Sequence, residues 1–186
     1  MSQLSQLVSY SQRPQHISQA QRIFHGRGHA YEGLKHVTID WLPPVILITL
    51  FEPESSPAID DLANDLQALL PECSSVQLQH RYELAGPIDV IKGEAITDLA
   101  ITEGELQFNI SLGKARNTGL FLDMQTGRAW VQANSKGLRV LNLFSYTCGF
   151  SVAAIAGGAK SVLNADMSSA ALNVGRENHR LNQQDL

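Results

Sequence analysis

The chain has 186 residues, of which 44% are hydrophobic and 17% are charged, enough to bury one ordinary core or two small ones. No apolar run reaches eighteen residues and the polar start "MSQLSQLVSYSQRPQ" has no signal-peptide core, so we expect no membrane span and a cytoplasmic protein. The net charge of −4 argues against a general nucleic-acid binder, but an acidic middle (52–105) between basic ends fits a protein that meets a polyanion with part of its surface.

Residues 1–32 show no sustained hydrophobic periodicity, and we interpret them as an N-terminal arm. Residues 33–113 carry alternating strand and helix patterns, which predict a small α+β domain of β-β-α-β-β type. Its predicted elements are strands at 34–42 and 45–52 separated by Pro43-Pro44, a helix at 55–71, a strand at 75–83 and a hairpin at 99–112 that turns at Glu103-Gly104.

Residues 114–186 form a third section with the pattern of an α/β sheet. After a helix predicted around 125–134, the strand "RVLNLFS" (139–145) is apolar almost throughout, as in a parallel strand covered on both faces. A small-residue helix, the strand "SVLNAD" (161–166) and a helix with Ser168 as its cap follow. Strand, helix, strand and helix in short succession predict the start of a doubly wound sheet.

The loop "FSYTCG" follows the first of these strands, where ligands of open parallel sheets bind. The start of the next helix favours a carboxylate or phosphate, and Asp166, at the end of the second strand, can accept hydrogen bonds from ribose hydroxyls. The loop has no G-x-G for a pyrophosphate, and its hydroxyl side chains suit S-adenosylmethionine better than NAD. A strand–helix unit that binds nothing is the alternative. Two cysteines fit no zinc pattern, so we expect no metal.

Four segments together resemble the bacterial S-adenosylmethionine-dependent methyltransferases of large-subunit ribosomal RNA, the group of 5-methylcytosine and 7-methylguanosine type. The segments are "NTGLFLDMQTGR" (117–128), "VLNLFSYTCGFSVAAIAGGA" (140–159), "VLNADMS" (162–168) and "RENHRLN" (176–182). The resemblance covers roughly residues 75–186. It implies an N-terminal small α+β domain (33–113) followed by the first half of a Rossmann-like methyltransferase core (114–186).

The resemblance also implies a set of cofactor contacts. The loop around the methionine end would comprise Phe144, Ser145, Tyr146, Thr147 and Gly149. Asp166 would take the ribose and Met167 would pack near the adenine, while Phe121, Asp123 and Gln125 would reach over the cofactor.

Two residues depart from the family pattern. The loop has Cys148 where relatives usually have glycine, which would cost on the order of 1 kcal/mol if the position needs a positive φ. A cysteine in the cofactor loop lies on the wrong side of the methyl group to act as the nucleophile of 5-methylcytosine chemistry. Gln125 stands where relatives commonly have arginine, which removes a positive charge near the cofactor or RNA.

The family's Asp-Pro-Pro catalytic motif is not found, and only two strands of its core are present. We expect a fragment that is itself inactive, or a chain whose sheet is completed by a partner or by a second copy in a homo-oligomer. The predicted function of the whole protein is methyl transfer from S-adenosylmethionine to a base of large-subunit ribosomal RNA, on either carbon or nitrogen. Candidate RNA contacts are Arg13, Arg22, Arg27, Lys114, Arg116 and Arg128.

Two other functions remain open at this point. One is a non-catalytic RNA-binding or assembly module that keeps the cofactor half-site as a scaffold. The other is an NAD-linked enzyme, which the absent G-x-G disfavours.

Overall fold

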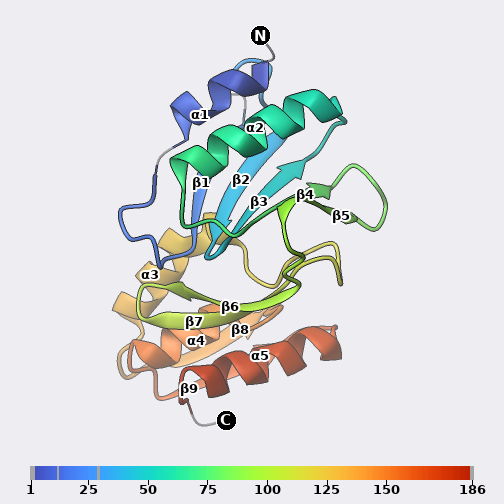
Figure 1. Cartoon of the computed structure of the whole chain (residues 1–186). Helices are drawn as coiled ribbons and strands as arrows, with labels where there is room; N and C mark the ends of the chain where they lie inside the picture. Colours follow the sequence, from blue (N-terminus) through green and yellow to red (C-terminus); the bar gives the residue numbers. More distant parts are fainter. Residues whose placement is uncertain (1–2, 12, 29, 185–186) are drawn as a thin grey trace. The chain divides into compact units, whose positions relative to one another are not determined.

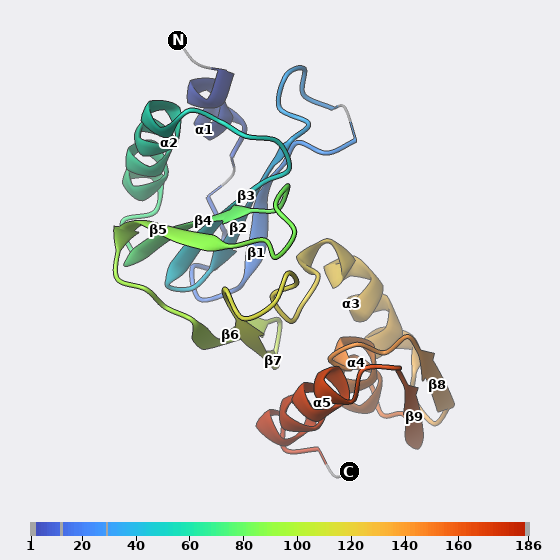
Figure 2. The same cartoon turned by 90° about the vertical axis from the view of Figure 1, so that its right-hand side faces the viewer.

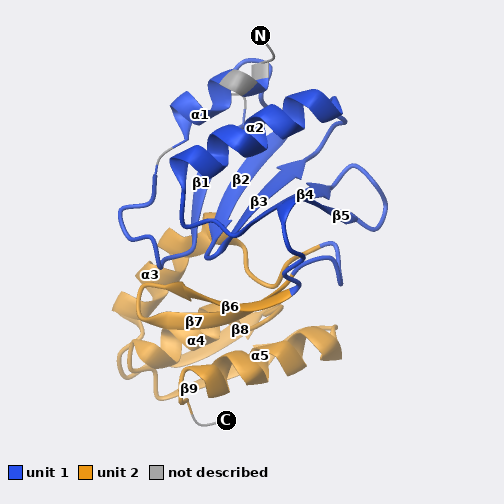
Figure 3. Ribbon diagram, in the orientation of Figure 1, with its two compact units in different colours: residues 1–97, 112–116 blue, residues 98–111, 117–186 orange. Residues whose placement is uncertain are grey.

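The computed structural model describes residues 3–11, 13–28 and 30–184 (Figure 1). Two compact units divide the chain (Figure 3). The first comprises Met1–Thr97 and Leu112–Arg116, and the second comprises Asp98–Ser111 and Asn117–Leu186. This grouping differs from the expected boundary after residue 113, because the hairpin of residues 98–111 belongs to the second unit.

The first unit is built on a five-stranded sheet in the order β1-β2-β3-β4-β5. Only β3 and β4 are parallel, and α2 joins them, because a parallel pair needs a long crossover connection. The other neighbours are antiparallel, and β2 passes to β3 through the Pro43-Pro44 turn, whose peptide bond is cis. The bounds are η1 Gln3–Gln6, α1 Leu7–Tyr10, β1 Gln21–His25, β2 Val37–Leu42, β3 Val45–Leu50, α2 Ser56–Leu69, β4 Ser75–His80 and β5 Ile88–Gly93.

One face of this sheet carries the apolar core. Ile39 and Trp41 of β2 pair with Ile48 and Ile46 of β3, so their side chains share a face with Val76 and Leu78 of β4. These side chains pack with the apolar faces of η1, α1 and α2 in one buried cluster. Figure 1 shows α1 and α2 over the same side of the sheet. The cluster therefore stabilises this unit mainly through the hydrophobic effect.

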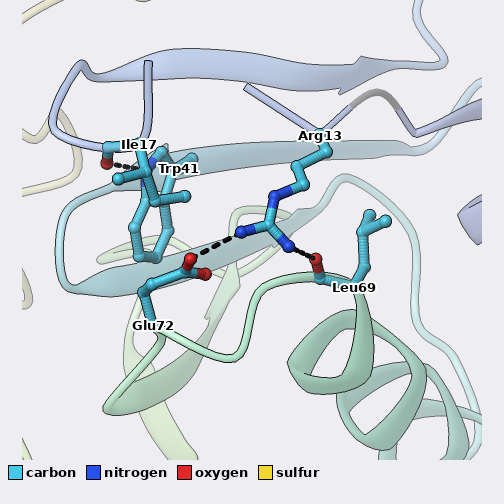
Figure 4. Close-up of polar contacts among 5 residues, drawn as sticks. All are labelled: Arg13, Ile17, Trp41, Leu69 and Glu72. Carbon is cyan, nitrogen blue, oxygen red and sulfur yellow. Dashed lines mark hydrogen bonds and ion pairs between the residues drawn. The ribbon is translucent and has the colours of Figure 1, made fainter. Parts of the chain in front are cut away.

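Polar contacts lie at the edge of this core (Figure 4). The indole Nε1 of Trp41 donates a hydrogen bond to the carbonyl of Ile17 at 2.8 Å. The guanidinium of Arg13 contacts the Glu72 carboxylate at 2.5 Å and donates to the Leu69 carbonyl, at the end of α2, at 3.2 Å. These bonds attach the segment after α1 to the sheet and the helix.

Two strands of this sheet were not expected. β1 lies within the residues interpreted as an arm, and its pairing with β2 contains a bulge between Arg22 and Phe24. The bulge buries the adjacent side chains Ile23 and Phe24 together, so the alternation that marks a strand in a sequence is lost. β5 is an edge strand whose side chains are partly or fully exposed, and it carries no apolar alternation either.

The second unit combines a hairpin, a two-stranded parallel sheet and three α-helices. β6 and β7 pair antiparallel, and Gly104 holds a positive φ of 63° at their turn, as the hairpin prediction requires. β8 and β9 are parallel and are joined by α4. The bounds are β6 Asp98–Glu103, β7 Leu106–Ser111, η2 Leu122–Met124, α3 Gln125–Asn134, β8 Arg139–Leu143, α4 Gly149–Ala156, β9 Ser161–Ala165 and α5 Ser169–Leu181.

The predicted order of elements from 125 onward is confirmed. The Ser168 hydroxyl accepts a hydrogen bond from the Ala171 amide at 3.1 Å, which is the expected cap of α5. One expectation fails within the described residues, because one face of β8 and β9 is exposed. Its apolar side chains are Leu141, Leu143 and Leu163, each more than half exposed.

Candidate functional site

The loop between β8 and α4 has an unusual backbone. Phe144, Tyr146 and Cys148 have φ values of 53°, 48° and 62°, in the left-handed region that side chains other than glycine rarely adopt. Each such residue costs about 1–2 kcal/mol. Cys148 therefore occupies a position that does require a positive φ. Three strained residues within five positions persist only if neighbouring contacts hold them in place.

The carboxylate of Asp166 supplies one of these contacts. Its Oδ2 accepts a hydrogen bond from the Tyr146 amide at 2.8 Å, and its Oδ1 accepts one from the Ser168 amide at 2.8 Å. The Asp166 side chain thus faces the loop, with lone pairs left to accept further bonds. The two amides lower the pKa of Asp166, Ser168 more than Tyr146. The stability that these bonds contribute is therefore present at pH values above the ordinary pKa of an aspartate. It is lost as the pH falls through the lowered pKa of Asp166.

Three further hydrogen bonds brace the loop. The Ser145 amide donates to the Ala165 carbonyl at 3.1 Å, and the Cys148 amide donates to the Ser145 carbonyl at 2.8 Å. The Thr147 hydroxyl donates to the carbonyl of Gly119, at the start of the segment that leads into η2. The loop is therefore held from β9 on one side and from the 119–121 segment on the other.

A hollow of about 180 Å³ lies against this loop. It is smaller than the roughly 300–1,000 Å³ of a typical small-molecule pocket, so it has room for only part of a small molecule. Ser145 lines it, and the buried Oγ of Ser145 has no hydrogen-bond partner among the described residues. A buried hydroxyl without a partner is costly, and a polar ligand group would satisfy it. The lining residues are Gly119–Phe121, Met124, Arg128, Asn142–Thr147, Gly149 and Phe150.

Six of the ten residues predicted to contact a cofactor line this hollow, namely Phe121, Phe144, Ser145, Tyr146, Thr147 and Gly149. The rings of Phe121 and Tyr146 lie 5.5 Å apart between centroids. Asp166 is joined to the group through its bond to Tyr146. Met167, Asp123 and Gln125 do not line the hollow, and the Met167 side chain is fully exposed.

Arg128 was expected to contact RNA, and the structure contradicts this. Its side chain is buried and forms a two-pronged ion pair with Glu103 of the hairpin, at 2.7 and 2.6 Å. Its third nitrogen donates to the Phe121 carbonyl at 3.0 Å, so Arg128 supports the wall of the hollow. A buried guanidinium is paired because desolvation of an unpaired charge is too costly. Nothing in the sequence marks Glu103 as its partner, since the two are 25 positions apart.

Arg22 is also engaged within the protein. It forms a two-pronged ion pair with Asp40 at 2.8 and 3.0 Å, in the first unit. The Cys148 thiol is buried, and burial raises its pKa, so it stays protonated and unreactive near neutral pH.

Within 3–11, 13–28 and 30–184, no cluster of three or more His, Cys, Asp or Glu side chains is arranged to hold a metal ion. In that same part of the chain, no helix has the length and apolar character needed to cross a membrane.

Comparison with known proteins places the chain in a family. Residues 21–186 match the family model described as S-adenosylmethionine-dependent methyltransferase. Ribosomal RNA large subunit methyltransferase I of Cronobacter sakazakii is 35% identical over 164 residues, which cover 83% of this chain and 41% of that protein. The chain thus spans about two fifths of the length of the curated relatives it matches.

Solved structures agree with this match. A methyltransferase structure from Streptococcus mutans, described as dependent on S-adenosylmethionine, superposes with a TM-score of 0.79 at 26% identity, over 91% of this chain and 44% of that one. The structure of the methyltransferase SMU.776 in complex with SAH (S-adenosylhomocysteine) gives the same scores and coverage. The matched region contains β8, the strained loop, α4, β9 and Asp166. The chain therefore belongs to the S-adenosylmethionine-dependent methyltransferase family.

Proposed function

We propose that the loop of residues 144–149 and Asp166 bind S-adenosylmethionine, and that the protein methylates a base of large-subunit ribosomal RNA. The observation that carries the cofactor assignment is the hydrogen bond from the Tyr146 amide to Asp166. It joins the ends of β8 and β9 beside a hollow lined by Ser145, whose buried hydroxyl has no hydrogen-bond partner among the described residues. Ligands of open α/β sheets bind at this edge.

When bound, S-adenosylmethionine supplies a methyl group on a positively charged sulfonium. The residues of this chain would bind and orient it. The free lone pairs of the Asp166 carboxylate would accept hydrogen bonds from the two ribose hydroxyls. The Ser145 hydroxyl and the amides at the start of α4 would bind the carboxylate of the methionine end. Phe121 and Tyr146, whose rings are in contact, would cover it.

Support for ribosomal RNA as the substrate comes from the relatives, which are named as large-subunit ribosomal RNA methyltransferases. The proposal leaves the modified nucleotide and its acceptor atom open. Catalysis would rest mainly on positioning the methyl donor against the base. We expect the 186-residue polypeptide to bind the cofactor weakly and to transfer no methyl group by itself, because it contributes two strands of the methyltransferase sheet.

Calorimetry with S-adenosylhomocysteine and, separately, with NAD tests the cofactor assignment. We expect heat from S-adenosylhomocysteine alone. Asp166→Asn keeps the size of the side chain but replaces one acceptor oxygen by a donor, and it should weaken binding at least about tenfold. Asp61→Asn, at an exposed acid of α2 that does not line the hollow, is the matched control and should bind within about twofold of wild type.

Binding of NAD without S-adenosylhomocysteine would refute the assignment, and so would equal binding by the Asp166→Asn variant. The substrate is tested with the product of the complete reading frame that contains this sequence. Tritiated methyl groups should enter ribosomal RNA from a strain that lacks the gene, and not RNA from the wild-type strain. Equal labelling of the two RNAs, or labelling of transfer RNA alone, would overturn the substrate assignment.

A further inference from the structure

Asn178, within the "RENHRLN" segment, makes a buried contact that sequence reasoning did not anticipate. Its side chain is 0% exposed on α5. Its Oδ1 accepts hydrogen bonds from the amide and from the Nδ2 of Asn109, on β7, at 2.9 and 3.1 Å. Its Nδ2 donates to the Thr147 carbonyl at 2.9 Å. One side-chain amide therefore joins the hairpin to the strained loop.

Asn182, the C-cap residue that follows α5, also contacts β7. Its Oδ1 accepts from the Gln107 amide at 2.9 Å and its Nδ2 donates to the Gln107 carbonyl at 2.7 Å. Asn182 thus pairs with the edge of β7 as a neighbouring strand would, whereas Asn178 only accepts hydrogen bonds from that edge. Only Asn178 also reaches the loop between β8 and α4.

The bonded carbonyl is placed where it controls the loop. Thr147 lies between Tyr146 and Cys148, both at positive φ. Because the peptide is planar, holding the Thr147 carbonyl also holds the amide of Cys148. Gly175 lets α5 come this close, since a Cβ there would lie 2.4 Å from the Cys148 Sγ.

We infer that Asn178 is a positioning residue that holds loop 144–149 in its strained form, and that hairpin β6–β7 supports the site through it. The link to S-adenosylmethionine rests on the proposed function above. Asn178 does not line the hollow, so it acts through Thr147 rather than on a ligand. Both the backbone amide and the side-chain Nδ2 of Asn109 donate to the Oδ1 of Asn178. Together they fix the orientation of the Asn178 side-chain amide.

The test compares Asn178→Asp with Asn182→Ala in two measurements. Asn178→Asp keeps the acceptor for Asn109 and loses the donor to the Thr147 carbonyl, whereas Asn182→Ala loosens α5 from the same strand without touching the loop. We expect Asn178→Asp to speed hydrogen exchange at the Tyr146 and Cys148 amides, and to weaken S-adenosylhomocysteine binding, each at least about tenfold. Asn182→Ala should leave both within about twofold while speeding exchange at Gln107.

The two measurements separate this inference from the proposed function. Equal loop exchange in the two variants overturns the inference, whatever the ligand does. A different outcome is that the wild-type protein binds no S-adenosylhomocysteine, while loop exchange becomes faster in the Asn178 variant and not in the Asn182 variant. That outcome overturns the proposed function and supports the positioning role. If Asn178→Asp speeds exchange throughout the unit, Asn109→Ala decides, because it removes only the 3.1 Å bond. Faster exchange confined to the loop then supports the inference, and unchanged exchange overturns it.

Discussion

The two units keep their folds by different means. In the first unit, strands β2 and β3 are buried along their whole length, and side chains from the sheet and the helices form one apolar cluster. Figure 2 shows α1 and α2 of this unit from a second direction. In the second unit, β8 and β9 expose an apolar face, and the loop between β8 and α4 is strained. Buried polar contacts there connect the hairpin to both walls of the hollow.

The difference lies in the kind of contact that stabilises each unit. Burial of apolar area is non-directional and tolerates small shifts of the backbone. Buried hydrogen bonds and ion pairs are directional, and each is costly to leave half-made. A site that must hold a loop in an unfavourable conformation therefore depends on the second kind of contact.

The largest effect should come from Trp41 of the first unit, and Trp130 of the second unit provides an exposed tryptophan as its control. Trp41→Ala removes a side chain that is 1% exposed together with its bond to Ile17, and should lower the free energy of unfolding by about 3–5 kcal/mol. Trp130→Ala, at a side chain that is 66% exposed on α3, should change it by less than about 0.5 kcal/mol. Urea unfolding followed by circular dichroism measures both. Equal losses of unfolding free energy in the two variants would contradict the difference between the apolar core of the first unit and the exposed surface of the second.

Breaking the buried ion pair of the second unit comes next. Arg128→Met leaves the Glu103 carboxylate buried without its partner and should cost about 3 kcal/mol. The double variant Arg128→Met with Glu103→Leu should recover most of this loss, since an apolar pair needs no partner. Hydrogen exchange at β6 and α3 amides reports the change. A double variant as unstable as the single one would contradict the explanation.

A smaller effect is expected at Gly175, where α5 meets the loop. Gly175→Ala places a Cβ 2.4 Å from the Cys148 Sγ, and the resulting shift should cost about 1–3 kcal/mol. Gly127→Ala, inside α3, meets its nearest atom at an ordinary 3.4 Å and should instead stabilise by up to about 1 kcal/mol. Thermal unfolding of both variants checks the opposite signs. Stabilisation by Gly175→Ala would show that α5 does not press on the loop.

The smallest effect should follow loss of the exposed ion pair in Figure 4. Arg13 and Glu72 have side chains that are 48% and 42% exposed, so Arg13→Ala should cost at most about 1 kcal/mol. The loss should shrink further in 0.5 M salt, whereas that of Arg128→Met should not. Urea unfolding at two salt concentrations distinguishes them. A loss of unfolding free energy above about 2 kcal/mol that does not depend on salt would show that Arg13 behaves like the buried Arg128–Glu103 pair.

Elements whose signal is local could be predicted from the sequence. The apolar run of β8, the small-residue helix α4 and the Ser168 cap of α5 each lie in a short window, and the structure confirms them. That the loop and Asp166 lie together could also be predicted, because the carboxyl ends of neighbouring parallel strands lie at one edge. β1 escaped prediction because its bulge removes the period of two.

What the sequence by itself determined is therefore the order of elements and the edge of the sheet at which the candidate site lies, since both follow from periodicity and chain direction. Only the tertiary structure decided what holds the site. Arg128 meets a partner 25 positions away, and Asn178 bridges partners that are 69 and 31 positions away. Such pairs carry no local pattern, because a buried polar side chain is matched by whichever group the fold brings beside it.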